Sequence, residues 1–264
     1  MSESKEWAGK VALVTGGGSG IGAAAARMIA AKGATVALLD VVEASVSKVH
    51  DEIVAAGGKA FMLLADVGDE AQMKAAYEAI AVKEGRIDMM VVSAGINGTW
   101  APVDDMTPEE FDRTIRINLR GTYLSFHYGV PLLKKAGGGS IVVISSMNGQ
   151  RVVSTAGASA YSATKAAQAA MARQLALELS GARIRVNSIF PGATETNIGQ
   201  NTWRRNVEDI RIKVEFAGGD VPITGGKRAK AEDVAEGIVF LCSDAARHIT
   251  GAELNIDGGQ SLIR

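Results

Sequence analysis

The stretch Val11-Ala-Leu-Val-Thr15-Gly16-Gly17-Gly18-Ser19-Gly20-Ile21-Gly22 runs from a short apolar segment through a glycine loop into an alanine-rich segment. The apolar segment is typical of a strand buried on both faces, and residues 21–32 have the composition of a helix. Glycines between a strand and a helix let the backbone approach a pyrophosphate, whose charge meets the amino end of the helix. The spacing is T-G-x-x-x-G-x-G, and no Gly-Lys-Ser/Thr follows, so the loop indicates a dinucleotide site and disfavours a P-loop.

The same alternation of apolar runs and helix-like segments continues along the chain. The apolar runs are residues 11–14, 35–39, 60–64, 87–92, 141–144, 184–189 and 253–256. Helix-like segments closed by glycine separate the first four of them, which is typical of parallel strands joined by helical crossovers. No linker or change of composition divides the chain. We therefore predict an α/β fold: a single doubly wound domain over residues 1–264, with about seven mostly parallel strands and helices on both faces.

Composition and charge exclude several classes of protein. Hydrophobic residues make up 47% and charged residues 22%, with a formal net charge of −1, which argues against disorder and against a basic nucleic-acid interface. Cys242 is the only cysteine, the three histidines lack ligand spacing, and no apolar run is long enough to cross a bilayer. The first residues also lack the apolar core of a signal peptide. We expect a cytoplasmic protein without a metal site, a nucleic-acid partner or a membrane partner.

Residues 197–230 depart from this pattern, because they are glycine-dotted and polar. Trp203, Arg204 and Arg205 within them are typical of a short amphipathic helix. Long loops in compact domains tend to be functional, so the segment is interpreted either as a lid over the substrate or as a surface excursion.

Asp40 indicates which dinucleotide is bound. It ends the second apolar run, twenty residues after Gly20. A carboxylate at that position can accept hydrogen bonds from both ribose hydroxyls of an adenosine and repels a 2′-phosphate. Ser19 and Val41 stand where an arginine could have bound that phosphate. These residues predict NAD rather than NADP.

Polar or small residues close four further runs. Asp66-Val67 follows the third, where a carboxylate could bond the adenine amino group, and Ser93-Ala94-Gly95 follows the fourth. Ser145-Ser146 closes the fifth run and Pro191-Gly192 the sixth. Because ligands of open α/β sheets bind outside the carboxyl ends of the strands, we expect all of these residues at one edge.

Tyr161 and Lys165 are four residues apart and form a pair that is suited to acid–base chemistry. Residues 161–180 contain no Gly or Pro, so they predict a helix that places the phenol and the ammonium on one face. A cation about 4 Å away contributes roughly 4 kcal/mol at an effective dielectric near 20. That would lower the phenol pKa by up to about three units and make Tyr161 a workable base.

As a set, these motifs resemble the short-chain dehydrogenase/reductase family, and the resemblance extends over roughly residues 9–262. The residues that carry it are 15–22, Asp66, Asn118, Ser146, Tyr161-x-x-x-Lys165, Pro191-Gly192-x-x-x-Thr196, Thr250-Gly251 and Asp257-Gly258-Gly259. The resemblance implies a Rossmann-type fold that binds a nicotinamide cofactor, and a homotetramer or homodimer.

The resemblance also implies roles for single residues. Tyr161 is the general acid/base, and Lys165 lowers its pKa while binding the nicotinamide ribose. Ser146 hydrogen-bonds the substrate oxygen, and Asn118 anchors a water that continues the proton path. Cofactor contacts are expected from Gly16, Ser19, Gly20, Ile21, Gly22, Asp40, Asp66, Val67, Ser93, Gly95, Tyr161, Lys165, Pro191, Gly192, Thr194 and Thr196. Substrate contacts are expected from Ser146, Asn148 and Tyr161.

Two features depart from the family pattern. The fourth run ends in Val92-Ser93-Ala94-Gly95 where the family commonly has Asn-Asn-Ala-Gly. The family serine usually precedes the tyrosine by about thirteen residues, whereas Ser146 precedes Tyr161 by fifteen. A strict count points to Asn148, but the strand end favours Ser146. The extra residues fall within 148–158, which should overhang the substrate.

The sequence therefore predicts an NAD-dependent oxidoreductase that interconverts a secondary alcohol and a ketone. A small polar substrate such as a sugar or polyol is favoured because polar residues occupy the loops expected around the site. These residues are Asn97, Asn148, Arg151, Thr155 and Arg204. The alternatives are a 3-oxoacyl-thioester reductase, a non-catalytic NAD-binding regulator and, without need of the Tyr–Lys pair, a methyltransferase with a Rossmann-like sheet.

Overall fold

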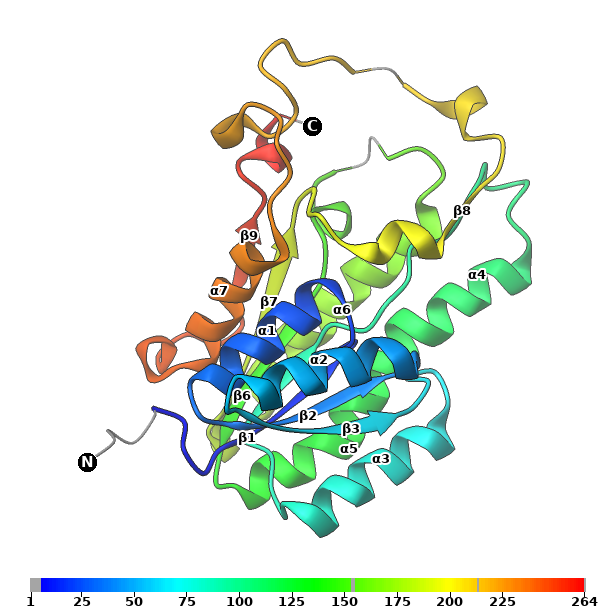
Figure 1. Cartoon of the computed structure of the whole chain (residues 1–264). Helices are drawn as coiled ribbons and strands as arrows, with labels where there is room; N and C mark the ends of the chain where they lie inside the picture. The colour runs from blue at the N-terminus through cyan, green and yellow to red at the C-terminus, as the bar shows by residue number, and fades with distance from the viewer. Residues whose placement is uncertain (1–5, 153–154, 213, 264) are drawn as a thin grey trace.

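Seven parallel strands form one sheet in the order β3-β2-β1-β4-β6-β7-β9 in the computed structural model, which describes residues 6–152, 155–212 and 214–263 (Figure 1). The strands are β1 (Val11–Thr15), β2 (Thr35–Asp40), β3 (Lys59–Leu64), β4 (Met89–Val92), β6 (Gly139–Ile144), β7 (Ile184–Pro191) and β9 (Glu253–Ile256). Each coincides with a predicted apolar run, so the predicted sheet is confirmed. The expectation for residues 1–5, and parts of those for 148–158 and 197–230, lie outside the described residues.

Helices cover both faces of the sheet. They are α1 (Gly20–Ala31), α2 (Glu43–Ala55), α3 (Glu70–Lys83), α4 (Pro108–Thr114), the π-helix η1 (Ile115–Arg120), α5 (Gly121–Lys135), α6 (Ser159–Glu178) and α7 (Ala231–Cys242). Short 3-10 helices are η2 (Met147–Gly149), η3 (Ser180–Ala182), η4 (Asn197–Asn201), η5 (Val207–Ile210), η6 (Pro222–Thr224), η7 (Asp244–Ala246) and η8 (Gln260–Leu262).

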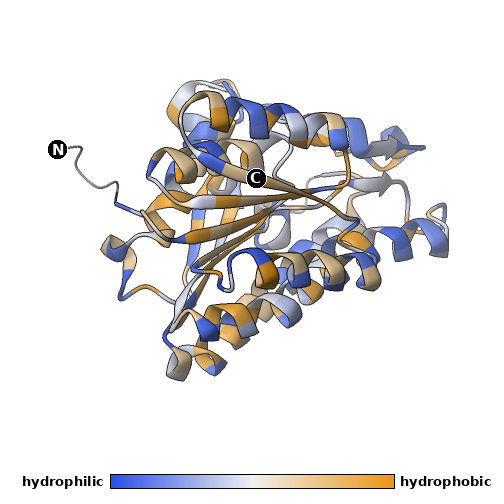
Figure 2. Ribbon diagram, turned by 60° about the horizontal axis from the view of Figure 1, so that its bottom comes forward, coloured by the Kyte–Doolittle hydropathy of each residue, from blue (hydrophilic) through white to orange (hydrophobic). Residues whose placement is uncertain are grey.

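The two faces of the sheet explain why the strands are apolar at every position. Ala12 and Val14 of β1 pack into one core with α1, α2 and α7, whereas Leu13 between them packs into a second core with α3, α5 and α6. Successive strand residues point to opposite faces, so a strand covered on both sides needs apolar residues throughout. Figure 2 shows the strands as largely hydrophobic ribbons between helix layers whose outer sides are hydrophilic.

The strand order reverses between β1 and β4, since β2 and β3 lie to one side of β1 and β4 lies on the other. Thr15 ties these two strand ends together, because its Oγ1 accepts hydrogen bonds from the Ser93 amide at 3.1 Å and the Ala94 amide at 3.2 Å. Gly16 follows at φ +68°, and a Cβ there would lie 2.9 Å from Ala94 Cα. The ligand crevice of such a sheet opens at this reversal.

A second, two-stranded parallel sheet was not predicted. It consists of β5 (Gly98–Trp100) and β8 (Thr202–Arg204) in the register Thr99↔Trp203. The predicted amphipathic helix at Trp203–Arg205 is therefore wrong. Thr202–Arg204 are extended because they pair with β5, and alternate side chains face opposite sides of the ribbon.

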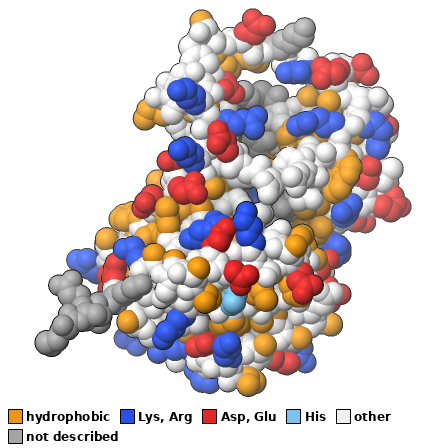
Figure 3. Space-filling view, viewed as in Figure 1, with side chains coloured by type: hydrophobic (Ala, Val, Ile, Leu, Met, Phe, Trp, Pro, Cys, Tyr) orange, Lys and Arg blue, Asp and Glu red, His pale blue; other side chains and the backbone are white. Residues whose placement is uncertain are grey.

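The remaining part of residues 197–230 contains only short 3-10 helices and irregular chain among its described residues. In Figure 1 it arches over the top of the molecule, and Figure 3 shows the surface hollowed beneath the arch. Within the described ranges, no helix is both long and apolar enough to cross a membrane. The same residues contain no group of three or more acidic, His or Cys side chains placed to hold a metal ion.

Candidate active site

The glycine loop leads into the amino end of α1, which has no side-chain cap among the described residues. Ser19 is the N-cap residue, but its side chain caps no amide, and the first turn of α1 carries no acidic residue. A Cβ at Gly22 would lie 2.2 Å from the carbonyl oxygen of Gly16, so the loop can close this tightly only with glycine at that position. Uncapped amides and the positive end of the helix dipole fit a pyrophosphate group.

Asp40 is fixed beside this loop. Its Oδ2 accepts a hydrogen bond from the Gly18 amide at 2.9 Å, and its Oδ1 accepts one from the Val42 amide at 3.1 Å. A Cβ at Gly18 would lie 2.9 Å from Oδ2, so the chain approaches the carboxylate closely. The carboxylate is thus held at the end of β2, where an adenosine ribose would meet it.

The segment after β7 reaches the same loop. A Cβ at Gly20 would lie 3.2 Å from Thr196 Cβ, which places Thr196 against the first residue of α1. Thr194 Oγ1 donates to the Gly192 carbonyl at 3.1 Å. The predicted cofactor residues from the two halves of the chain therefore lie together.

Gln260 supports this segment and was not anticipated. Its Oε1 accepts a hydrogen bond from the Ala193 amide at 2.7 Å, and its side chain is buried. The only signal in the sequence was its position directly after the Asp257-Gly258-Gly259 motif. Gln260 holds the turn that follows Gly192 in place.

Asp66 at the end of β3 has a protein partner. Its Oδ2 accepts a hydrogen bond from Arg116 Nη1 at 2.9 Å, and its Oδ1 accepts one from the Gly68 amide at 2.8 Å. Val67 beside it packs against Gly121, where a Cβ would lie 2.8 Å from Val67 Cγ2. Arg116 was not predicted at the site, and an isolated arginine in a helical segment carries no signal. Contact of Asp66 with adenine stays a prediction.

Tyr161 and Lys165 lie on the buried face of α6, with 8% and 4% of their surface exposed. Lys165 Nζ lies 5.6 Å from the centre of the Tyr161 ring and donates a hydrogen bond to the Ile144 carbonyl at 2.8 Å. A Cβ at Gly95 would lie 3.7 Å from the same Nζ, so the end of β4 also borders the pair. The predicted one-turn pairing on a helix face is confirmed.

The predicted lowering of the phenol pKa is wrong for the protein alone. Burial raises the pKa of Tyr161, and a hydrogen bond with Ser146 only partly opposes that effect. Burial likewise lowers the pKa of Lys165 to about 8. Loss of water disfavours the charged form of each group, and the amine donates to the Ile144 carbonyl.

Ser146 lies beside the phenol, as its interaction with Tyr161 shows. It is the N-cap of η2, and its Oγ accepts a hydrogen bond from the Asn148 amide at 3.2 Å. A Cβ at Gly149 would lie 2.7 Å from Lys165 Cβ, so η2 packs directly on α6. The strand end, rather than the strict residue count, thus locates the serine that adjoins Tyr161.

Asn118 lies in the π-helix η1 and is fully buried. Its Oδ1 accepts a hydrogen bond from the Ile96 amide, and its Nδ2 donates to the Ile96 carbonyl, both at 2.9 Å. Nδ2 also donates to Thr164 Oγ1 at 3.1 Å. The side chain joins the loop after β4 to α6, the helix of Tyr161 and Lys165, while its contact with a water stays a prediction.

The β5–β8 ribbon attaches residues 197–230 to the body of the protein. Asn97 Nδ2 donates to Thr202 Oγ1 at 2.8 Å, and Arg205 contacts both carboxylate oxygens of Glu110, at 3.0 and 2.9 Å. On one face of the ribbon the Arg113 guanidinium lies 4.5 Å from the centre of the Trp203 ring. On the other face Arg204 lies 5.0 Å from the Trp100 ring centre.

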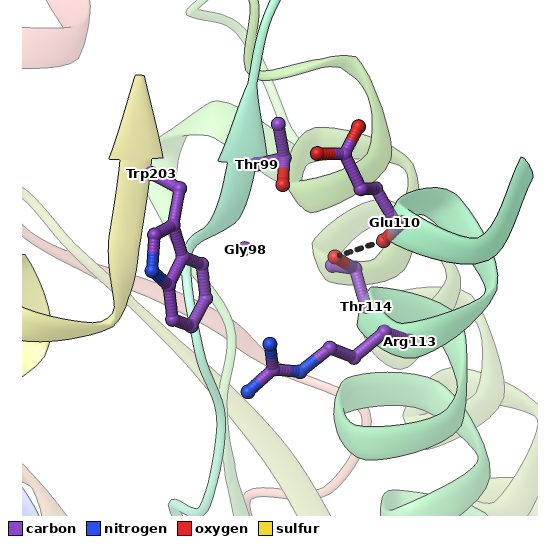
Figure 4. Close-up of a pocket in the computed structure, with 6 residues that line it drawn as sticks. All are labelled: Gly98, Thr99, Glu110, Arg113, Thr114 and Trp203. Carbon is purple, nitrogen blue, oxygen red and sulfur yellow. Dashed lines mark hydrogen bonds between the residues drawn. The ribbon is translucent and has the colours of Figure 1, made fainter. Parts of the chain in front are cut away.

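A cavity of about 220 Å³ lies between the ribbon and α4 (Figure 4). Its lining residues are Gly98, Thr99, Glu110, Arg113, Thr114 and Trp203. Neither Ser146 nor Tyr161 lines it, so it is separate from the predicted chemistry. Its walls belong to the attachment of the 197–230 segment.

Comparisons with known proteins agree with this geometry. A family model described as enoyl-(acyl carrier protein) reductase matches residues 16–261. D-threitol dehydrogenase of Mycolicibacterium smegmatis is 37% identical over 254 residues, which cover 96% of this chain and 94% of the relative.

Two solved structures are also similar. A 3-ketoacyl-ACP reductase from Sinorhizobium meliloti 1021 has a TM-score of 0.93 and 56% identity, and the match covers 96% of this chain and all of that one, 100%. A 3-ketoacyl-(acyl-carrier-protein) reductase from Brucella melitensis complexed with NADH has a TM-score of 0.84 and 35% identity, covering 97% of this chain and 100% of that one. With its glycine loop, its Tyr161–Lys165 pair and these relatives, the chain belongs to the short-chain dehydrogenase/reductase family and is a nicotinamide-dependent oxidoreductase of CH–OH groups.

Proposed function

We propose that the protein interconverts a small polar secondary alcohol, such as a polyol or sugar, and its ketone with NAD(H). The observation that carries this proposal is the buried cluster of Ser146, Tyr161 and Lys165 at the edge of the sheet where the glycine loop opens. The D-threitol dehydrogenase relative supports a polyol substrate.

The residues of the cluster divide the chemistry between them. When bound, the nicotinamide accepts or supplies hydride at its C4. In oxidation, Tyr161 takes the hydroxyl proton as the carbon loses hydride and the C=O bond forms; in reduction, it returns a proton to the oxygen. Ser146 hydrogen-bonds that oxygen and holds it against the phenol. Lys165 is placed by the Ile144 carbonyl between Tyr161 and Gly95, where it would contact the nicotinamide ribose.

The preference for NAD over NADP rests on Asp40. We expect Asp40→Asn to reduce the ratio of the NADP and NAD dissociation constants about 10- to 100-fold. The amide keeps the shape and can still accept from the Gly18 amide, but it no longer repels the 2′-phosphate. The measurement is titration of the protein with each cofactor.

Asp51→Asn is the matched control, because Asp51 is an exposed carboxylate in α2 that contacts only His50 among the described residues. It should leave the ratio unchanged. Wild-type protein that binds NADP as tightly as NAD would contradict the role given to Asp40.

We infer that residues 197–230 form the substrate lid and that Arg205 anchors it. The bidentate contact with Glu110 holds the pKa of that carboxyl at about 2, well below its usual value, so the ion pair persists throughout the pH range of an assay. Arg205→Met should raise KM for the alcohol about 10-fold and change kcat less than about threefold. In the variant, the lid would become ordered only when substrate binds, and this ordering would reduce the affinity for substrate.

Steady-state kinetics of Arg205→Met and of Arg211→Met test this assignment. Arg211 lies in the same segment, and among the residues that the structure describes its side chain pairs with Glu208 alone, at 3.5 Å, with both side chains exposed. The control variant should resemble wild type. Equal KM values for the two variants would show that the anchor does not affect substrate binding.

A second candidate substrate is a 3-oxoacyl thioester, which the similarity to the Sinorhizobium meliloti reductase favours. A screen of purified protein against polyols, sugars and hydroxy acids with NAD, and against an acetoacetyl thioester with NADH and NADPH, separates the candidates by cofactor absorbance. Turnover of the thioester alone would replace the alcohol proposal. A non-catalytic regulator would turn over none of these compounds while binding NADH.

We also propose that the protein is a cytoplasmic homotetramer or homodimer. Its support is the family and the exposed apolar residues on α5 and α6, among them Tyr123 and Leu177. Light scattering of the purified protein measures the assembly.

A further inference from the structure

Gln168 is a fully buried amide on the helix face that carries the catalytic pair. It follows Lys165 by three residues and Tyr161 by seven, so it lies one turn farther along the same side of α6. Its exposed surface is 0%, and Ala169, Ala172 and Ala176 nearby are buried apolar residues. An amide at such a position has lost its hydration, so its contacts must explain its presence.

The amide nitrogen of Gln168 donates two hydrogen bonds, one to the π-helix η1 and one to the first turn of α5 that follows it. Gln168 Nε2 donates to the Asn118 carbonyl at 2.9 Å and to Thr122 Oγ1 at 2.7 Å. Thr122 Oγ1 in turn donates to the same carbonyl at 2.7 Å. The Oε1 of Gln168 is buried and has no hydrogen-bond partner among the residues that the structure describes. The side chain is therefore oriented by its contacts to Asn118 and Thr122.

Asn118 is therefore held both through its side chain and through its backbone carbonyl. The Asn118 side chain hydrogen-bonds Ile96 and Thr164, whereas Gln168 donates to the Asn118 backbone carbonyl. We call the contacts of Gln168 with Asn118 and Thr122 the clamp. Each hydrogen-bonded turn of a π-helix contains one residue more than a turn of an α-helix. If η1 relaxed to an α-helix, the helix that follows would rotate by about 100° for that residue, and Asn118 would move. The clamp thus couples the loop after β4 to the helix that presents Tyr161 and Lys165.

We propose that Gln168 is a positioning residue for the hydride-transfer reaction. It keeps η1 in the π-helical conformation. Through Asn118 it also fixes the position of the loop at Ile96 relative to Tyr161 and Lys165. This role rests on the proposed oxidoreductase function, but the clamp itself is testable without turnover.

The first test replaces the amide with a side chain of similar length that cannot donate. Gln168→Met should lower kcat about 10- to 100-fold with KM for the alcohol changed less than about twofold, because a shift of about 1 Å in the reacting groups has an effect of that size. Ser125→Ala is the control, since it removes buried hydrogen bonds of a neighbouring helix, to the Gly121 carbonyl at 2.8 Å and with Tyr77, without touching Asn118. The two variants should lose similar thermal stability, and only Gln168→Met should lose kcat.

The second test restores the donor by protonation. In Gln168→Glu the carboxyl can donate to the Asn118 carbonyl only in its neutral form, so ketone reduction relative to wild type should improve as the pH falls. Of the charged groups on the neighbouring turns, Lys165 lies one turn away, while Arg116 and Arg120 of η1 pair with Asp66 and Glu70. Gln168→Met, which has no proton to gain, should keep a constant ratio to wild type.

Hydrogen exchange provides the readout that does not depend on activity. The clamp predicts faster exchange of the Ile96 amide and of residues 115–120 in Gln168→Met than in Ser125→Ala. Faster exchange with unchanged kcat would overturn the positioning role, and unchanged exchange would overturn the clamp. If wild-type protein turned over no substrate, the proposed function would fail, while the exchange result would still decide the clamp.

Discussion

Tyr161→Phe is expected to lower kcat in both directions by about 10²- to 10⁴-fold, the usual contribution of a positioned general acid or base. The variant keeps the buried ring and its packing against Lys165, so the affinity for NADH should change less than about twofold. Rapid-quench turnover and fluorescence titration with NADH measure the two quantities separately.

The pH dependence of wild-type protein identifies the same group. Because burial raises the pKa of Tyr161, the phenol stays protonated to higher pH than a free tyrosine. Alcohol oxidation needs the deprotonated form and should become faster as the pH rises, whereas ketone reduction needs the protonated form and should be retained at neutral pH. Tyr161→Phe should lose this dependence. Tyr123→Phe, which alters a half-exposed ring in α5, should behave as wild type in both assays. A Tyr161→Phe variant that retained full turnover would remove the catalytic assignment.

Lys165→Met is expected to do two opposite things: lower kcat at least about 100-fold and stabilise the fold. Burial lowers the pKa of Lys165 from 10.5 to about 8, a shift worth about 3 kcal/mol against the charged amine in the folded state. Removing the amine leaves the Ile144 carbonyl unpaired at a cost of about 1 kcal/mol. The net gain at pH 7 is then about 2 kcal/mol.

The gain should depend on pH in a defined way. Below pH 8 the lysine is charged in both folded and unfolded protein, so the full penalty applies to wild type. Between pH 8 and 10.5 the folded protein releases the proton before the unfolded chain does, and the penalty disappears. Urea unfolding of wild type and variant at pH 7 and above pH 10 measures this difference. A stability gain that stayed constant with pH would show that the charge of Lys165 is not what destabilises the site.

Much of the fold followed from local patterns. The seven apolar runs predicted every strand of the large sheet, because strands covered on both faces are apolar at each position and need no distant information to be recognised. The glycine loop was recognisable for a related reason. The close contact between Gly22 and Gly16 leaves no room for a side chain, so the requirement is written in the residue type.

The Tyr161–Lys165 spacing and the strand end at Ser146 were equally local and placed these three side chains together. Two other features were not local. Trp203–Arg205 suggested a helix, but β5 paired with it from about a hundred residues away in the chain. The direction of the phenol pKa shift is opposite to the prediction, because burial disfavours the charged form of the phenol.

By itself the sequence determined the doubly wound sheet, the glycine loop and the placement of Tyr161 and Lys165 on one helix face, since periodicity, glycine content and helical spacing are properties of neighbouring residues. Only the tertiary structure decided which groups Gln168 and Gln260 contact, how residues 197–230 are attached and in which direction burial shifts the pKa values of Tyr161 and Lys165. Those properties depend on hydrogen-bond partners and on exclusion of water, which are set by residues distant in the chain.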